Sequence, residues 1–121
     1  MKITRWGVYD CKHIADRPPQ ELSRDKRPKR RYVVITNEDL IRHSDRLHCV
    51  PIGEKSHLKM FDIELENDEA GCTKPSYIWG FEVYTILKTD FIAKVGDLPK
   101  NKANRLEKVI RNALSLNRHD A

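Results

Sequence analysis

The strongest constraint on the fold is a change of hydrophobic period along the chain. Over the first three-quarters, short segments rich in β-branched and aromatic residues are separated by turn residues, which is typical of β-strands. After Pro99, apolar residues recur at intervals of three and four, which predicts one helix over residues 99–116. The sequence therefore predicts a mainly β fold with a C-terminal α-helix.

The strand pattern can be placed segment by segment. We expect a long loop at 12–29, a helical turn or loop at 38–45, strands at 3–11, 31–37, 46–52, 58–66 and 76–87, and a short strand or turn at 91–98. Gly80 predicts a bulge or kink inside the segment 76–87. Strands this short favour a small barrel closed or capped by the helix, since closure removes exposed sheet edges. With no internal repeat and no long linker, we expect one domain over residues 1–121.

The net charge of +5 comes from one place in the chain. The window Arg24–Arg31 holds six basic residues and one acid, and the remaining residues carry equal numbers of basic and acidic side chains. Such a cluster either binds phosphate groups through counterion release or forms a solvated loop. A targeting signal is the weakest interpretation, because the cluster runs directly into the apolar segment "YVVIT".

Several classes of protein are disfavoured by the sequence. No apolar run approaches the roughly 18 residues that a membrane span needs, and residues 1–10 lack the apolar core of a signal peptide. We therefore expect a cytoplasmic protein that does not bind membranes. The three cysteines contain no C-x-x-C pair and the five histidines are scattered, so we expect structural thiols and neither a metal site nor a cofactor.

The order of the segments resembles the MazF/PemK/Kid family of toxin endoribonucleases from bacterial toxin–antitoxin systems. The resemblance covers residues 4–116 and is carried by "RRYVVITN", "CVPI", "MFDIELE" and "KPSYIWGFEVYTILKTDFIAKVGDL". It implies an SH3-like β-barrel that forms a homodimer. It also implies cleavage of single-stranded RNA without a metal, and an antitoxin that masks the RNA groove.

The resemblance transfers to some site positions and not to others. The family's second strand begins Arg-Pro, with the Arg on phosphate; here Arg30 matches, and Arg31 occupies the Pro position. Its third strand ends Pro-Ile-Thr or Pro-Thr, with the hydroxyl in the active site, whereas this chain has Gly53 after Pro51-Ile52. Ser56 and His57 follow closely and are candidates to replace that hydroxyl.

Metal-free RNA cleavage requires a base for the 2′-OH proton, an acid for the leaving 5′-oxygen, and cations beside the phosphorane. Arg suits the last role and His the proton transfers. Neighbouring side chains alternate along a strand, so Arg30 and Arg31 should face opposite sides, with only one of them in a given groove. The catalytic candidates are Arg30, His57 and Glu21; the RNA-binding candidates are Lys29, Arg31, Ser56, Lys55, Glu82 and His13.

The aromatic residues of the predicted strands have two possible roles. They are either core residues or platforms for stacking of RNA bases. The candidates are Trp6, Trp79, Tyr77 and Tyr84, of which Tyr84 takes the position of a basic residue in many family members.

Two alternatives to a ribonuclease remain open. The first is a catalytically inactive module on the same barrel that binds nucleic acid or protein, which the missing hydroxyl at Gly53 favours. The second is a poison of topoisomerase like the related CcdB barrel. That activity relies on a C-terminal aromatic end, and this chain finishes "LNRHDA".

Overall fold

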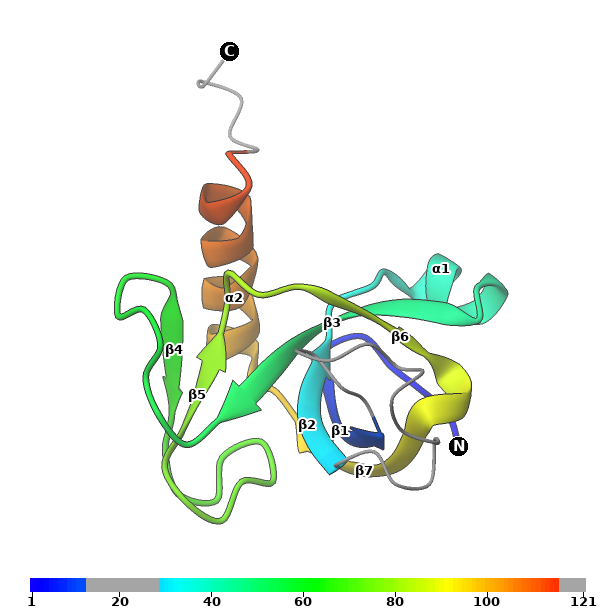
Figure 1. The fold of residues 1–121 in the computed structure, drawn as a ribbon, viewed down its shortest axis with the longest axis horizontal. Helices are drawn as coiled ribbons and strands as arrows, with labels where there is room; N and C mark the ends of the chain where they lie inside the picture. The colour runs from blue at the N-terminus through cyan, green and yellow to red at the C-terminus, as the bar shows by residue number, and fades with distance from the viewer. Residues whose placement is uncertain (13–28, 116–121) are drawn as a thin grey trace, which may run out of the picture.

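The computed structural model describes residues 1–12 and 29–115 (Figure 1). The elements in chain order are β1 (Gly7–Lys12), β2 (Lys29–Val34), α1 (Glu38–His43), β3 (Arg46–Gly53), β4 (Asp62–Leu65), β5 (Ser76–Trp79), β6 (Tyr84–Leu87), a 3-10 helix (Lys88–Asp90), β7 (Phe91–Asp97) and α2 (Lys100–Ala113). The prediction of a mainly β fold with a C-terminal helix is confirmed, and α2 lies inside the expected range 99–116.

All described strand pairs are antiparallel and belong to one sheet with the order β4-β5-β3-β2-β1-β7. β6 pairs with the first half of β3, from Arg46 to Cys49. β5 pairs with the last two residues of the same strand, Ile52 and Gly53. Among the described residues, the end strands β4 and β7 do not pair with each other. The sheet is therefore open, and the expected closure of the barrel through strand pairing is not found.

The central strands are buried on both faces of the sheet. Val8, Val33 and Val50 belong to one apolar cluster, which also contains Leu106 of α2. Their neighbours along the strands, including Tyr9, Tyr32, Val34 and Cys49, belong to a second cluster on the opposite face. Because successive strand residues point to opposite faces, burial on both sides accounts for the continuous apolar run "YVV" in β2.

The helix α2 packs on the sheet through one face, and its C-terminal half projects past the strands (Figure 1). Ala103 and Leu106 are buried in the core, while Leu114 just beyond the helix is exposed. Glu107 and Arg111 form the expected i,i+4 ion pair on its outer side, at 3.8 Å. The helical period of the sequence thus located both the buried and the solvent-facing side of α2.

The first strand begins later than expected. Residues 4–7 form a turn, closed by a hydrogen bond from the Gly7 amide to the Thr4 carbonyl at 3.1 Å. Trp6 adopts a left-handed backbone with φ 66°, which a strand residue does not have. The prediction of a strand from residue 3 is therefore wrong, and β1 starts at Gly7.

The segment 76–87 is two strands and not one. From Ile78 to Tyr84 the chain advances six residues, whereas their partners Ile52 and Cys49 on β3 are three residues apart. The surplus residues bulge out as a turn, in which the Glu82 amide donates to the Trp79 carbonyl at 3.0 Å. A Cβ at Gly80 would lie 2.5 Å from Cγ1 of Val109 on α2, so the kink predicted at this glycine has a packing cause.

The fourth strand is shorter than its alternating pattern predicts. β4 covers only Asp62–Leu65, with Ile63 and Leu65 buried as the alternation requires. Before it, the amides of Phe61 and Asp62 both donate to the Leu58 carbonyl, at 2.9 and 3.0 Å. Because of this turn, the residues before Asp62 do not pair as a strand, and Met60 within the turn is exposed.

Candidate active-site groove

Two adjoining pockets form one groove where β2 begins and β3 ends, here called the basic groove. Their shared lining consists of Lys29, Arg31, Ile52, Gly53 and Glu54. One end, the Arg31 pocket, adds Asp10, Cys72, Thr73, Lys74 and Ser76. The other end, the His57 pocket, adds Arg30, Pro51, Lys55, His57 and Trp79. Five basic side chains and two acidic ones therefore line the groove, and its potential favours anions.

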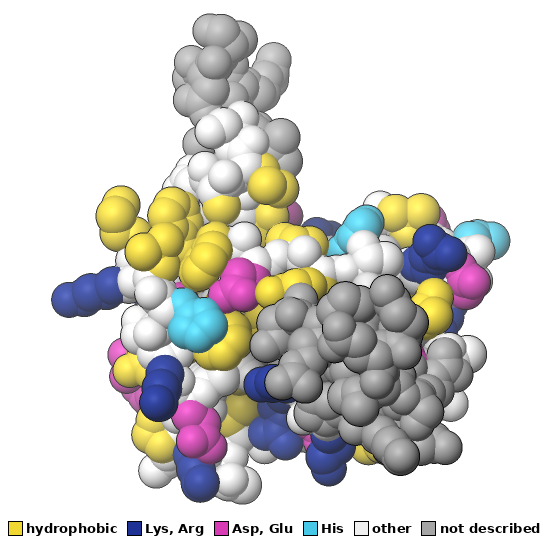
Figure 2. All heavy atoms as spheres, in the orientation of Figure 1, with side chains coloured by type: hydrophobic (Ala, Val, Ile, Leu, Met, Phe, Trp, Pro, Cys, Tyr) yellow, Lys and Arg dark blue, Asp and Glu magenta, His cyan; other side chains and the backbone are white. Residues whose placement is uncertain are grey.

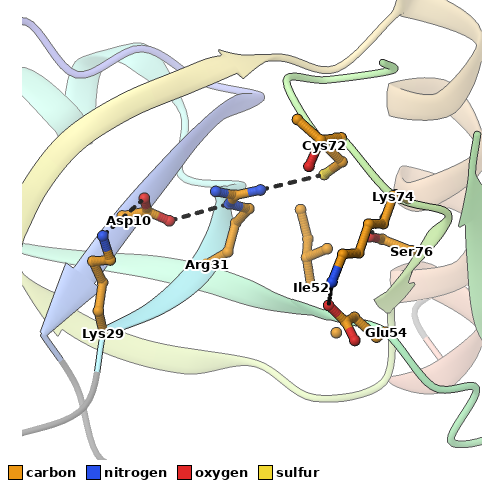
Figure 3. A pocket seen from close by; sticks show the side chains of 10 residues that line it. Asp10, Lys29, Arg31, Ile52, Glu54, Cys72, Lys74 and Ser76 are labelled. Carbon is orange, nitrogen blue, oxygen red and sulfur yellow. Dashed lines mark hydrogen bonds and ion pairs between the residues drawn. The ribbon is translucent and has the colours of Figure 1, made fainter. Parts of the chain in front are cut away.

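The Arg31 pocket is held by a cross-strand ion pair (Figure 3). Asp10 of β1 lies opposite Arg31 of β2 in the sheet register. The Nε of Arg31 donates to Asp10 Oδ1 at 3.1 Å, and a terminal nitrogen donates to Cys72 Sγ at 3.9 Å. Partial burial opposes the charged form of Arg31, but these two hydrogen bonds outweigh it, so its pKa lies above the ordinary value. Arg31 is thus a cation with partners of its own.

The opposite wall of the Arg31 pocket carries charges that are exposed to solvent. Lys74 Nζ lies 3.6 Å from Glu54 Oε1, and both side chains are about 70% accessible (72% and 70%). Lys29 at the junction lies 3.9 Å from Asp10 Oδ2 and is also largely exposed. An incoming phosphate could displace such contacts at little cost, since exposed ion pairs contribute little free energy.

The His57 pocket contains an oriented imidazole. His57 Nδ1 lies 2.8 Å from Glu82 Oε2, and its ring stacks on Trp79 with centroids 3.5 Å apart and planes inclined by 13°. The Trp79 indole is fixed in turn, because its Nε1 donates to the Lys55 carbonyl at 2.8 Å. The stack on Trp79 therefore fixes the plane of the His57 ring, and the hydrogen bond to Glu82 fixes its direction within that plane.

The loop that carries His57 is fastened at its base by one carboxylate. Asp62 Oδ2 accepts hydrogen bonds from Ser56 Oγ at 2.6 Å, from the His57 amide at 2.8 Å and from the Leu58 amide at 2.9 Å. The Ser56 hydroxyl is already used as the donor in this hydrogen bond. Ser56 also lines a separate pocket between β4 and α2, together with Arg105. The hydroxyl of Ser56 thus faces away from the basic groove.

The structure explains why glycine occupies position 53. A Cβ built there would lie 2.1 Å from Cζ2 of Trp79, so any larger residue clashes with the indole. The family resemblance leads us to expect a hydroxyl at this position, and here the indole of Trp79, on which His57 stacks, occupies the space that a side chain would need. The loss of one polar group and the gain of the His57–Trp79 stack are therefore parts of one arrangement.

The β3–β4 loop, which carries His57, and the β5–β6 turn, which carries Glu82, also present an apolar surface. The exposed residues Leu58, Met60, Phe81 and Val83 flank His57 and Glu82 in the sequence. Figure 2 shows hydrophobic side chains gathered on this side of the molecule, over β4 and β5 next to α2. The His57–Glu82 pair therefore lies at a border between apolar and basic surface.

The structure brings five of the predicted site residues into one groove, namely Lys29, Arg30, Arg31, Lys55 and His57. Glu82 joins them through its contact with His57. Both arginines line the His57 pocket, so the expectation that only one faces a given groove is wrong: the groove crosses the exposed first residues of β2. His13 and Glu21 lie outside the described residues.

Two further properties follow from the described part of the chain. Within residues 1–12 and 29–115, no group of three His, Cys, Asp or Glu side chains is arranged to hold a metal ion. None of the helices in those ranges is long and apolar enough to cross a membrane.

The arrangement of the elements and the sequence both match a known family. The model of the PemK-like, MazF-like toxins of type II toxin–antitoxin systems matches residues 14–114. The chain belongs to this family. No curated protein sequence matches the chain closely enough to count as a relative.

Solved structures of the family share the fold at low sequence identity. An endoribonuclease from a mycobacterial species, solved with its cognate antitoxin, has a TM-score of 0.76 at 15% identity and covers 96% of this chain and 98% of its own. The Mycobacterium tuberculosis toxin MazF-mt6 has a TM-score of 0.71 at 19% identity, with 92% and 98% covered. MazF in a MazE–MazF complex from Deinococcus radiodurans has a TM-score of 0.73 at 6% identity, with 93% and 96% covered.

Sequence reasoning missed four residues that shape the site of this PemK/MazF-family chain: Asp10, Asp62, Cys72 and Lys74. Asp10 and Arg31 are neighbours only through the β1–β2 register, and the long loop between these strands hides that register in the sequence. Cys72 and Lys74 come from the β4–β5 connection, for which no pairing signal exists. Asp62 was detectable in principle, because a carboxylate a few residues after Ser-His can cap the turn between them.

Proposed function

We propose that this chain is an endoribonuclease toxin that cleaves single-stranded RNA in the basic groove. The observation that carries the proposal is the continuity of the groove, which joins several cationic side chains to an oriented imidazole. Cations along a groove follow a phosphate backbone, and the imidazole supplies a proton acceptor near neutral pH. Family membership supports the same reaction, and so does the likeness to two mycobacterial endoribonucleases.

The proposed reaction is attack of a ribose 2′-oxygen on the adjacent phosphorus, and it requires no metal ion. Arg30 at the groove contacts the phosphate and offsets the charge of the phosphorane, while Lys29, Arg31 and Lys55 attract the strand. His57 transfers the proton. Glu21 remains a sequence-based candidate for a catalytic role, and His13 for RNA contact.

The proposal includes three partners and a location. Single-stranded RNA is the substrate, a cognate antitoxin covers the groove, and a second copy of the chain completes a homodimer. The antitoxin complexes of two neighbours support the second of these. We expect the toxin to act in the cytoplasm, where expression arrests growth until the antitoxin is co-expressed.

An assay of the purified protein tests the reaction. A 5′-labelled single-stranded RNA should be cut to fragments that end in 2′,3′-cyclic phosphate, and added EDTA should leave the rate unchanged. The matched control is the same strand with 2′-deoxyribose at the cleaved position, which should bind and remain intact. No cleavage of a long RNA at high enzyme and low salt would overturn the proposal.

A second function is supported by one departure from the family pattern. Because Gly53 lacks the hydroxyl, the groove could serve a binding module that holds nucleic acid without cutting it. Retention of RNA by the wild-type protein in a filter-binding assay, with no fragments after long incubation, would establish this alternative instead.

A further inference from the structure

The imidazole of His57 is constrained at more points than a surface histidine requires. Its side chain is 41% exposed, yet its backbone amide donates to Asp62, its ring lies flat on Trp79, and its Nδ1 meets Glu82. Holding a half-exposed ring so firmly costs side-chain entropy. The arrangement is typical of a group whose direction matters for chemistry.

Glu82 is itself held for this contact. Its side chain is only 21% exposed, and the two carboxylate oxygens have different partners. Oε2 lies 2.8 Å from His57 Nδ1, and Oε1 accepts from the Tyr84 hydroxyl at 3.0 Å. The bulge between β5 and β6 places Glu82 outside the sheet, where it reaches the β3–β4 loop. A carboxylate fixed at both oxygens orients the group that it binds.

The hydrogen bond to Glu82 selects one tautomer of the neutral ring. A carboxylate accepts hydrogen bonds, so Nδ1 must carry the proton, and the lone pair then belongs to Nε2. Nε2 lies on the far edge of the ring from Glu82, in a residue that lines the groove with Arg30. The nitrogen left for a substrate is therefore a base.

We infer that Glu82 is a positioning residue for His57, and that Nε2 of His57 is the atom that takes the 2′-OH proton. This inference rests on the endoribonuclease function proposed above. Proton transfer to Nε2 frees the 2′-oxygen, which bonds to phosphorus as the bond from phosphorus to the 5′-oxygen breaks. The 5′-oxygen takes a proton from water, and the imidazolium later returns its proton to solvent, so protons and charge balance.

The role assigned to Glu82 differs from an RNA contact, and it also differs from a purely structural one. The negative charge of Glu82 stabilises the imidazolium that forms during the reaction, and its acceptor oxygen fixes the tautomer. Among the described residues, the pocket that His57 lines also contains the charged residues Lys29, Arg30, Arg31, Glu54 and Lys55, while Asp62 is committed to the loop backbone. Glu82 is thus the carboxylate bonded to the ring itself.

Two substitutions separate the charge of Glu82 from its hydrogen bond. Glu82→Gln keeps an acceptor and removes the charge, and we expect kcat to fall about 10-fold; Glu82→Leu removes both, and we expect a fall of about 100-fold, within the range of general base catalysis. KM and the affinity for the 2′-deoxy strand should change less than twofold. Glu66→Gln, which alters an exposed carboxylate beyond β4, is the matched control and should cleave at the wild-type rate.

A spectroscopic readout reports the positioning directly. In protein labelled with 15N-histidine, the neutral ring of His57 should show the Nδ1–H tautomer in the wild type and in Glu82→Gln. In Glu82→Leu it should shift toward Nε2–H. His57→Gln identifies the signal and should lower kcat by at least as much as Glu82→Leu, and thermal melts show whether each variant is folded.

The possible outcomes distinguish the two proposals. Wild-type kcat in a folded Glu82→Leu variant would overturn the role of Glu82, and so would a loss of strand affinity equal to the loss of rate. Wild-type tautomer populations in Glu82→Leu would overturn it as well. Failure of the wild-type protein to cut RNA would instead overturn the proposed function, while the tautomer measurement would still test whether Glu82 orients the ring.

Discussion

The two ends of the basic groove use similar side chains in opposite ways. In the Arg31 pocket the guanidinium is half-buried and bonded to Asp10 and Cys72. In the His57 pocket Arg30 is exposed, and within residues 1–12 and 29–115 no carboxylate lies at ion-pair distance from it. Adjacent arginines on one strand are therefore a stabilising residue and a residue directed to solvent.

This difference indicates which cation is available to a substrate. A guanidinium that already donates to a carboxylate must give up that bond to bind phosphate, and Asp10 would then lose its close partner. An exposed guanidinium pays no such cost and can offer its planar fork to two phosphate oxygens. We therefore expect Arg30 to bind phosphate and Arg31 to contribute mainly to the stability of the sheet and only weakly to attraction of the strand, and each of the following experiments is designed to break or sharpen that expectation.

The largest effect is expected at Arg30. Arg30→Ala should lower kcat/KM for RNA cleavage by about 100-fold, the usual cost of removing one group that stabilises a developing anion, and should leave the melting temperature unchanged. Arg42→Ala, an exposed arginine on α1 that pairs with Asp39, is the control and should retain full activity. A greater loss of activity in Arg31→Ala than in Arg30→Ala would reverse the assignment.

The junction of the two pockets gives the second prediction. Gly53→Thr restores the hydroxyl of the family pattern, but its Cβ would meet Trp79 at 2.1 Å. We expect the free energy of unfolding to fall by about 2 kcal/mol through overpacking, with loss of the His57–Trp79 stack and of cleavage. Urea denaturation and the cleavage assay measure these effects.

A double-mutant cycle identifies the cause of that loss. If the clash with Trp79 is responsible, the costs of Gly53→Thr and Trp79→Ala should not add, because the smaller side chain makes room for the new one. Increased cleavage by Gly53→Thr alone would contradict this view. It would show that the groove tolerates the hydroxyl and lacks only that group.

The sequence could predict the parts of the fold that burial of apolar residues dictates. The β2 run "YVV" and the helical period after Pro99 specify where apolar residues must be buried, and burial dictated the strands, the helix and its packed face. The broken strand at Gly80 was partly visible, since a glycine flagged the kink. The size of the bulge was not, because it depends on the pairing of β5 and β6 with the two halves of β3.

For the site, the sequence supplied residues but not partnerships. The groove residues Lys29, Arg30, Arg31, Lys55 and His57 could be nominated from charge, chemistry and family pattern. The contact of His57 with Glu82 spans 25 positions and exists only because a loop and a bulge meet across β3 and β5. Ser56 looked equally suitable, and only the structure places its hydroxyl on Asp62.

Substitution of Arg31 should have a smaller effect than substitution of Arg30, and it should lower stability instead of cleavage. Arg31→Ala should lower the free energy of unfolding by about 1–2 kcal/mol, because Asp10 is left half-buried without its 3.1 Å partner. Cleavage by the folded protein should change by less than a few-fold. Arg31→Ala combined with Asp10→Ala should recover part of the stability, and an unchanged urea midpoint in Arg31→Ala would show that the pair contributes nothing.

The smallest effect is expected at the exposed wall of the Arg31 pocket. Lys74 and Glu54 are 3.6 Å apart but largely solvated, so Lys74→Ala should change the free energy of unfolding by less than about 0.5 kcal/mol. If the RNA strand continues from the His57 pocket into the Arg31 pocket, Lys74 neutralises one phosphate. The slope of log affinity against log salt should then decrease by about 0.7, the value for one contact to a single strand.

Lys108→Ala on the exposed side of α2 is the control, and its salt slope should equal that of the wild type. The same slope in Lys74→Ala as in Lys108→Ala would mean that the strand ends at the His57 pocket. The basic groove would then bind RNA only at the end that contains Arg30 and His57, and the Arg31 pocket would serve the sheet alone.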